Sequence, residues 1–123
     1  MWLNLAEEDY TDMIVMQKSR RYRGAVLFSQ QAVEKIIKAY IVEHIAIYPR
    51  KTHFIEELLK DAKLDFKETD VQIKDIKELS KSYTRVRYVD LSQQYYSNKR
   101  DTDQLLQTAS LLYIWIKKKF KKN

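Results

Sequence analysis

Residues 25–41, AVLFSQQAVEKIIKAYI, give the clearest structural signal in the sequence. Small and apolar side chains recur there every three or four residues, which is the spacing of one face of an α-helix. The residues of this face are Ala25, Phe28, Ser29, Ala32, Ile36, Ala39 and Tyr40. The polar residues expected roughly opposite them are Gln31, Glu34, Lys35 and Lys38. Additional valines and isoleucines make the apolar zone wider than one neighbouring helix can cover, so this helix is predicted to be central or to face a second subunit.

Further helices are predicted on both sides of this central one. The chain has one Gly and one Pro, and so has few residues that favour sharp turns, which indicates long helices and short loops. The ranges expected for the other helices are 3–18, 54–59, 73–83 and 101–120. Pro49 ends the central helix, Thr52 is the expected N-cap of the next one, and residues 69–72 carry a capping-box pattern before the one after that. We therefore expect an all-α protein, an up-and-down bundle of about five helices in a single domain.

The composition favours one domain with a basic end. The chain has 123 residues, of which 45% are hydrophobic, enough for one core but not for two of comparable size. Of the formal net charge of +6, five charges come from the lysines between Lys117 and Lys122. We predict a helical bundle over residues 1–116 and a basic C-terminal tail over residues 117–123. Cations in the last turn of a helix are favourable opposite its dipole, and the same lysines could contact nucleic-acid phosphates.

Several classes of site find no support in the sequence. The absence of cysteine excludes thiolate chemistry and fits a reducing cytoplasm. His44 and His53 lie on either side of Pro49 without a zinc-ligand spacing, and Gly24 stands alone, so no phosphate-binding glycine loop is present. The acidic start of the chain differs from a secretory signal, and no apolar run is long enough to span a membrane. We expect a cytoplasmic protein with no membrane segment, no metal, no cofactor and no recognisable catalytic motif.

The helical pattern is lost over residues 84–100, where polar and aromatic side chains crowd together. The candidate site residues in this stretch are Arg85, Arg87, Tyr88 and Asp90. Two guanidinium groups on a short segment can hold a phosphate, a tyrosine can stack on a base, and an aspartate can orient an arginine. A structural interpretation stays open, in which Arg87 pairs with Asp90 or caps the preceding helix and Tyr88 is a core aromatic residue.

Several motifs together resemble the HEPN family, the higher eukaryotes and prokaryotes nucleotide-binding domain. They cover most of the chain and comprise residues 28–40 (FSQQAVEKIIKAY), Pro49, Thr52-His53, Leu58-Leu59 and the RYVD of residues 87–90. The resemblance implies a bundle of about five helices, often a homodimer, and frequent pairing with a minimal nucleotidyltransferase in toxin–antitoxin-like systems. The wide apolar zone of the central helix agrees with a homodimer.

The ribonuclease branch of this family carries an arginine that is followed, after four to six residues, by a histidine. With Arg87 as that arginine, the histidine would fall within residues 92–94, which are Ser, Gln and Gln. Counting from Arg85 also meets no histidine, and His53 belongs to a different motif. Because an imidazole is the usual group for acid–base cleavage near neutral pH, its absence argues against ribonuclease activity.

The leading hypothesis is therefore a non-catalytic HEPN module that binds nucleotide or RNA phosphate, pairs with a nucleotidyltransferase partner, or does both. One alternative is a divergent ribonuclease, in which Arg87 stabilises the transition state and Tyr88 or Asp90 replaces the histidine. Another alternative is a purely structural protein that positions a neighbouring protein and binds no ligand.

Overall fold

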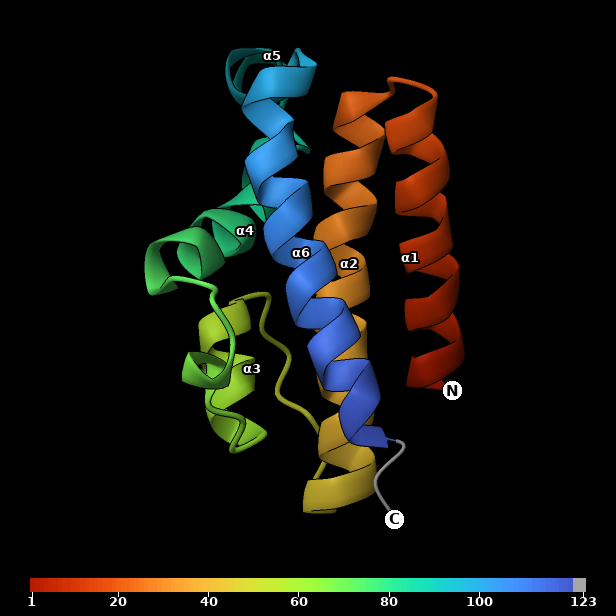
Figure 1. The fold of residues 1–123 in the computed structure, drawn as a ribbon, viewed down its shortest axis with the longest axis vertical. Coiled ribbons are helices and arrows are strands. Elements are labelled where there is room, and N and C mark those ends of the chain that lie inside the picture. The colour runs from red at the N-terminus through yellow and green to blue at the C-terminus, as the bar shows by residue number, and fades with distance from the viewer. Residues whose placement is uncertain (121–123) are drawn as a thin grey trace.

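Residues 1–120 are described by the computed structural model and form a helical bundle (Figure 1). The helices are α1 (Trp2–Lys18), α2 (Tyr22–Tyr40), α3 (Ile55–Asp61), α4 (Ile73–Arg85), α5 (Val89–Tyr96) and α6 (Lys99–Phe120). One π-helical turn, Ile41–Ile45, extends α2, and a short 3₁₀ turn, Phe66–Glu68, follows α3. No strand occurs in residues 1–120, so the predicted all-α, single-domain class is confirmed. None of these helices is long and apolar enough to cross a membrane, and residues 121–123 of the predicted tail lie outside the described range.

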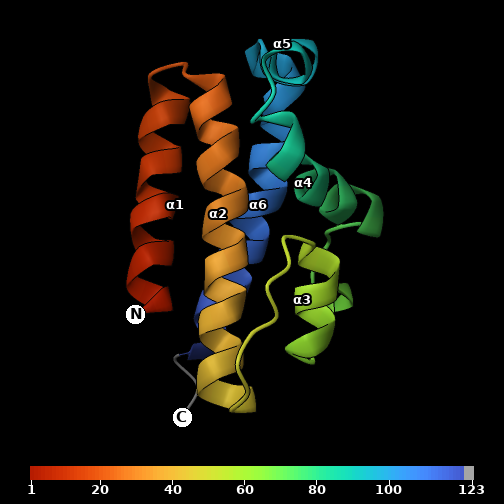
Figure 2. The same ribbon diagram turned by 180° about the vertical axis from the view of Figure 1, so that it is seen from behind.

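Helix α2 is the centre of the bundle, as predicted. It lies between α1 and α6, while α3, α4 and α5 gather on the side away from α1 (Figures 1 and 2). The fully buried core side chains of α2 include Val26, Val33, Ile36 and Ile37. Burial of each such side chain contributes roughly 1.5–3 kcal/mol to stability. Helices of the same chain therefore cover most of the wide apolar zone of α2.

The polar residues of α2 are not all turned away from the core. Glu34 and Lys38 were expected opposite the buried face, but they are only 5% and 7% exposed, so this prediction is wrong for both. Residues 46–54 run back along this side of α2 (Figure 2), and α4 also packs against the helix. His53 of this segment contacts Glu34, while Lys38 Nζ lies 5.5 Å from the centre of the Trp2 ring on α1. The two buried charges pair with each other, with Lys38 Nζ 2.9 Å from Glu34 Oε2.

The helix starts use different residues from those predicted. Thr52 and Thr69 each accept a hydrogen bond from the backbone N–H two residues ahead, at 3.2 and 3.1 Å. They thus form turns before α3 and α4 and do not cap these helices. Helix α6 starts two residues before Asp101, and the Asn98 side chain accepts from Asp101 N and donates to the Asp101 carboxylate, both at 2.9 Å. Asn98 followed three residues later by Asp101 is a helix-capping signal, and it places the start of α6 earlier than predicted.

The segment predicted to be irregular, residues 84–100, contains the short helix α5. Only Ser92 and Tyr96 are buried in α5, one turn apart. Eight residues with two buried positions carry too little apolar periodicity to indicate a helix. The chain therefore turns a corner between α4 and α5, and this corner carries Arg85 and Arg87.

Candidate functional site

Arg85 and Arg87 stand at the corner between α4 and α5 and have different partners. Nη1 of Arg85 lies 2.9 Å from Glu78 Oε1, and its guanidinium lies 3.9 Å from the centre of the Tyr95 ring. The Arg87 guanidinium lies 3.6 Å from the centre of the Tyr83 ring and donates a hydrogen bond to the Tyr83 carbonyl oxygen. A carboxylate therefore neutralises Arg85, whereas Arg87 forms no ion pair with a residue in the described range.

Tyr88 and Asp90 both face solvent where α5 begins. Tyr88 is 61% exposed, so it is not a core aromatic residue. Asp90 is also exposed, and across residues 1–120 it makes no ion pair with either arginine. Of the four predicted site residues, Arg87 and Tyr88 are thus adjacent in sequence and both have exposed side chains. The Arg85 side chain instead contacts Glu78 and Tyr95.

A stack of three side chains lies behind Arg87. The guanidinium of Arg87 is 3.6 Å from the centre of the Tyr83 ring, and the His53 ring is 3.5 Å from it and nearly parallel, at 13°. Two groups this close to one ring centre cannot share a face, so Arg87 and His53 lie on opposite faces of Tyr83. Nδ1 of His53 lies 2.8 Å from Glu34 Oε1. The stack thereby connects an exposed arginine to a buried carboxylate on α2.

Glu34 is the polar centre of this arrangement. It accepts hydrogen bonds from Gln30 Nε2 at 2.8 Å and from Lys38 Nζ at 2.9 Å, in addition to its contact with His53. Burial raises the pKa of Glu34, but the hydrogen bonds from Lys38, His53 and Gln30 outweigh burial and hold that pKa below its ordinary value. Glu34 is therefore ionised at neutral pH. Because a carboxylate only accepts hydrogen bonds, the proton of its contact with His53 lies on Nδ1, and Nε2 is the basic nitrogen of the neutral ring.

Gln30, Glu34, His53 and Tyr83 were not predicted as site residues. The available signals were the four-residue spacing of Gln30 and Glu34 and the Thr-His pair that follows Pro49. Neither signal shows that these four residues lie together in the fold. Gln30 and Glu34 belong to α2, His53 lies in the connection between α2 and α3, and Tyr83 belongs to α4.

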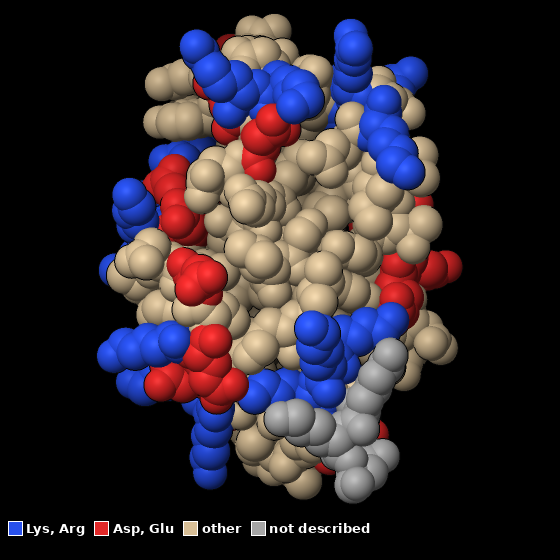
Figure 3. Space-filling view, viewed as in Figure 1, with Lys and Arg blue, Asp and Glu red and all other residues tan. Residues whose placement is uncertain are grey.

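Basic side chains gather at the end of the molecule that carries the α4–α5 corner. Figure 3 shows Lys and Arg there over α5, the start of α6 and the turn between α1 and α2. Arg23 Nε donates to the Val86 carbonyl oxygen at 2.9 Å, which joins the start of α2 to the corner. A hydrogen bond to Asp103 raises the pKa of Lys99, and the charge of Arg20 acts in the opposite direction, so Arg20 and Lys99 share this end of the molecule. The charge around the corner therefore favours an anion.

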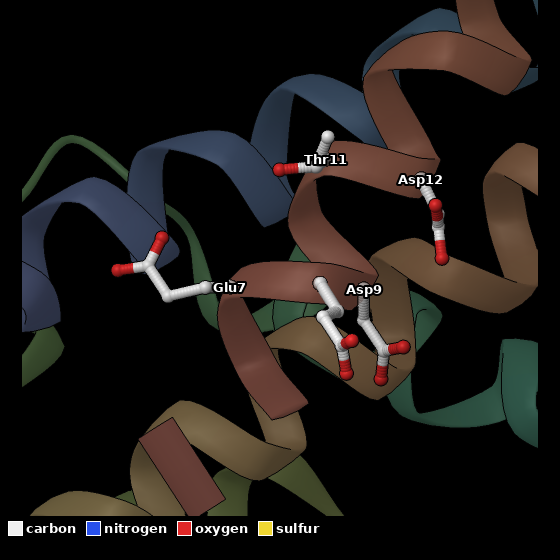
Figure 4. A pocket seen from close by; sticks show the side chains of 5 residues that line it. Glu7, Asp9, Thr11 and Asp12 are labelled. Atoms are coloured by element: carbon white, nitrogen blue, oxygen red, sulfur yellow. The ribbon is translucent and has the colours of Figure 1, made fainter. Parts of the chain in front are cut away.

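Helix α1 carries a surface of the opposite sign. A shallow pocket of about 440 Å³ on this helix is lined by Glu7, Glu8, Asp9, Thr11 and Asp12. Figure 4 shows four of these side chains, Glu7, Asp9, Thr11 and Asp12, projecting from α1. Asp9 already pairs with Lys35 at 2.6 Å, and Glu7 pairs with Lys117. Nowhere in residues 1–120 do three histidine or acidic side chains form a cluster that could hold a metal ion. This surface would repel a phosphate, so the α4–α5 corner remains the candidate anion site.

The fold and sequence match one known family of helical domains. The HEPN domain model matches residues 1–119, so the chain belongs to the HEPN family. The crystal structure of TT1696 from Thermus thermophilus is similar, with a TM-score of 0.75 and 23% identity over 96% of this chain and 94% of that one. The crystal structure of ST0689, an archaeal HEPN homologue, gives a TM-score of 0.69 and 24% identity over 96% of this chain and 93% of that one. No curated protein matches the sequence.

Proposed function

We propose that this HEPN domain binds the phosphate groups of a nucleotide or an RNA and does not cleave them. Arg87 is the central phosphate contact, and Tyr88 stacks on a base. The observation that carries this proposal is that Arg87 has no carboxylate partner among the described residues and is followed by a tyrosine that is 61% exposed. The basic end of the molecule supports it by attracting a polyanion.

Arg85 and Asp90 have secondary roles in this proposal. The ion pair between Arg85 and Glu78 weakens the field that Arg85 exerts on a phosphate. Asp90 offers a carboxylate acceptor beside Tyr88, which suits a ribose hydroxyl better than a phosphate.

The test is binding of a fluorescently labelled single-stranded RNA, measured by anisotropy at low salt. Arg87→Ala is expected to weaken binding about tenfold or more, since a hydrogen bond to a charged group contributes roughly 1.5–3 kcal/mol. Arg50→Ala is the matched control, because Arg50 is also an exposed arginine but pairs with Asp61 at 2.7 Å. A mononucleotide added as competitor shows whether one nucleotide is sufficient to occupy the site.

Two results would overturn the binding proposal. One is equal affinity of the Arg87→Ala and Arg50→Ala proteins for the RNA, and the other is no detectable binding at low salt. The RNA recovered from the mixtures should be intact, because the proposal assigns no catalytic residue.

One observation favours a ribonuclease as the second candidate function. His53 has a side chain that is 44% exposed, and Glu34 holds its Nδ1, so Nε2 is able to accept a proton from an RNA hydroxyl. Arg87, on the other face of Tyr83, would stabilise the charge of the transition state. The Tyr83 ring separates the two groups, which is why binding is the first proposal. For a ribonuclease, RNA in the mixtures above is cut, and His53→Ala stops the cleavage whereas His44→Ala does not.

We also propose that the protein is cytoplasmic, forms a homodimer, and pairs with a minimal nucleotidyltransferase in a toxin–antitoxin-like system. Membership of the HEPN family supports the nucleotidyltransferase partner. The homodimer is supported by α6, on which Leu111 and Ile114 are exposed. Figure 3 shows a broad area without charged side chains at the middle of the face that α6 crosses in Figure 1. Grouped apolar side chains of this kind are typical of protein interfaces. If no nucleotide or RNA binds, the remaining proposal is a purely structural role, in which this protein positions a neighbouring protein.

A further inference from the structure

The turn between α1 and α2 carries a cluster of cations without counter-charges. Its basic residues are Lys18, Arg20, Arg21 and Arg23. All of them are exposed, and none forms an ion pair with a residue in the described range. Like charges on neighbouring residues repel one another, and an anion that binds among them relieves this repulsion. The turn is therefore a second surface, besides the α4–α5 corner, that favours a phosphate.

Arg23 joins this turn to the corner that carries the proposed phosphate site. Its Nε donates a hydrogen bond of 2.9 Å to the carbonyl oxygen of Val86, the residue directly before Arg87. Val86 is fully buried, so this bond fixes the Arg23 guanidinium against the backbone of the corner. No residue of 1–120 accepts a hydrogen bond from Nη1 or Nη2 of Arg23. Both nitrogens are thus available for a phosphate beside the one that Arg87 binds.

A shallow pocket on the same turn suits a further part of a nucleic-acid strand. Its volume is about 470 Å³, within the range of about 300–1,000 Å³ that is usual for ligand pockets. Its lining residues are Met16, Arg20, Arg21, Tyr22, Arg23 and Gly24, none of which is acidic. Guanidinium groups bind phosphates, and the flat faces of arginine and tyrosine side chains stack on bases. The pocket therefore offers contacts to both the phosphate and the base of a nucleotide.

The start of α6 limits the direction in which a strand can leave the corner. Lys99 pairs with Asp103 at 2.7 Å, and Asp101 is exposed one turn of chain away. The hydrogen bond to Asp103 raises the pKa of Lys99, and Tyr22 and Arg20 also act on it, which places this pair beside the α1–α2 turn. The two aspartates repel a phosphate that lies over α6. A strand is better accommodated along residues 18–24, which include no acidic side chain.

We propose that the ligand of this domain is a single-stranded RNA of several nucleotides, which runs from the α4–α5 corner past Arg23 to the α1–α2 turn. This inference rests on the proposed function and selects a strand over a mononucleotide. Arg87 binds one phosphate, Arg23 binds the next, and the arginines of the pocket bind a further one. A duplex fits less well, because its bases stack on one another and are not open to Tyr22 and Tyr88.

The first test compares a uridine hexanucleotide with uridine monophosphate. Anisotropy of the labelled hexanucleotide at low salt gives its affinity, and competition gives that of the monophosphate. The equivalent positions along the hexanucleotide would by themselves tighten binding about sixfold, whereas contacts with both surfaces should tighten it about a hundredfold. The slope of log K against log salt should also be steeper for the hexanucleotide, by about 0.7 for each further phosphate contact.

The second test is the double variant Arg20→Ala/Arg21→Ala, which removes contacts on the turn. Neither side chain makes a hydrogen bond or ion pair within residues 1–120, so the variant is expected to fold, which circular dichroism checks. Its affinity for the hexanucleotide should fall about tenfold or more, while its affinity for the monophosphate should match that of the control. The matched control is Lys74→Ala/Lys77→Ala, which removes two exposed cations from the first turns of α4, at the opposite end of that helix from the corner.

The strand proposal is overturned if the hexanucleotide binds no more than about sixfold more tightly than the monophosphate, or if the double variant binds it as tightly as the control. In either case, weaker binding of the monophosphate by Arg87→Ala would still support the proposed function. If Arg87→Ala instead binds both ligands as tightly as wild type, the phosphate site at the corner is wrong, and the proposed function fails with it.

Discussion

The carboxylate of Glu34 has three hydrogen-bonding neighbours, and these decide how the protein responds to acid. The pKa of Glu34 is lower in the folded protein than its ordinary value of 4.5. The folded state therefore binds fewer protons than the unfolded state as the pH falls below that value. The stabilisation from Glu34 is fully present above about pH 4.5 and is lost as the pH falls through the lower pKa of the folded state.

Glu34→Gln is expected to lower the free energy of unfolding by about 3 kcal/mol at neutral pH, because it leaves the buried Lys38 without a counter-charge. Urea unfolding measures this change. Glu8→Gln, at an exposed position on α1, is the control and should stay within about 0.5 kcal/mol of wild type. The difference between wild type and Glu34→Gln should shrink as the pH falls below 4.5. A difference that stays constant into acid would show that Glu34 is not the titrating group.

At the scale of elements, three helix ends have backbones that favour glycine. Arg20, Ala46 and Lys63 have φ angles of 59°, 62° and 57°, and they lie just after α1, the π-helical turn and α3. The left-handed region is unfavourable for residues that carry a Cβ. The one glycine of the chain, Gly24, lies inside α2, where an added Cβ would come 3.1 Å from Met16 Sδ. The glycine thus serves the packing of α2 on α1, and the helix ends are left strained.

Ala46→Gly is therefore expected to raise the free energy of unfolding by about 0.5–1 kcal/mol, despite the greater freedom of glycine in the unfolded chain. Thermal or urea unfolding measures the gain. Ala39→Gly is the matched control, because Ala39 has a helical backbone near the end of α2, and this variant should be destabilised by about 1 kcal/mol or more. If both variants lost stability equally, the left-handed strain at position 46 would be insignificant.

The elements also show what the sequence could and could not predict. The ranges of α1, α2 and α6 were predicted closely, because each is long and has an apolar side chain on every turn. Helix α5 was missed because it has only two buried residues, Ser92 and Tyr96. The contact of His53 with Glu34 was missed for a different reason, since it depends on how residues 46–54 return along α2. A periodic pattern within one helix carries no information about such a return.

At the scale of the whole molecule, the question is what covers the uncharged face of α6. The proposed homodimer predicts that sedimentation velocity gives a dimer at micromolar concentration. Ile114→Lys should produce a monomer, because a charge at the centre of an apolar interface loses its hydration. Val15→Lys is the matched control, since Val15 is also an exposed apolar residue but lies on α1. A wild-type monomer at this concentration would refute the homodimer.

The candidate site was predicted only in part. Arg87 and Tyr88 were chosen from the sequence, and the structure gives both of them exposed side chains without a carboxylate partner in residues 1–120. Arg85 was chosen with them because it is two residues away, but a separation of two residues at the end of α4 directs the side chains to different neighbours. The sequence shows both arginines, but only the fold shows that Arg85 pairs with a carboxylate and Arg87 does not.

The position of Arg87 on the Tyr83 ring has a consequence for the thermodynamics of binding. A free arginine side chain carries about 2 kcal/mol of rotamer entropy, and a ligand that binds such a side chain must order it. Here the ring and the Tyr83 carbonyl oxygen already hold the guanidinium. The entropy of this side chain is therefore lost when the protein folds, and a phosphate that arrives later meets an arginine that is already ordered.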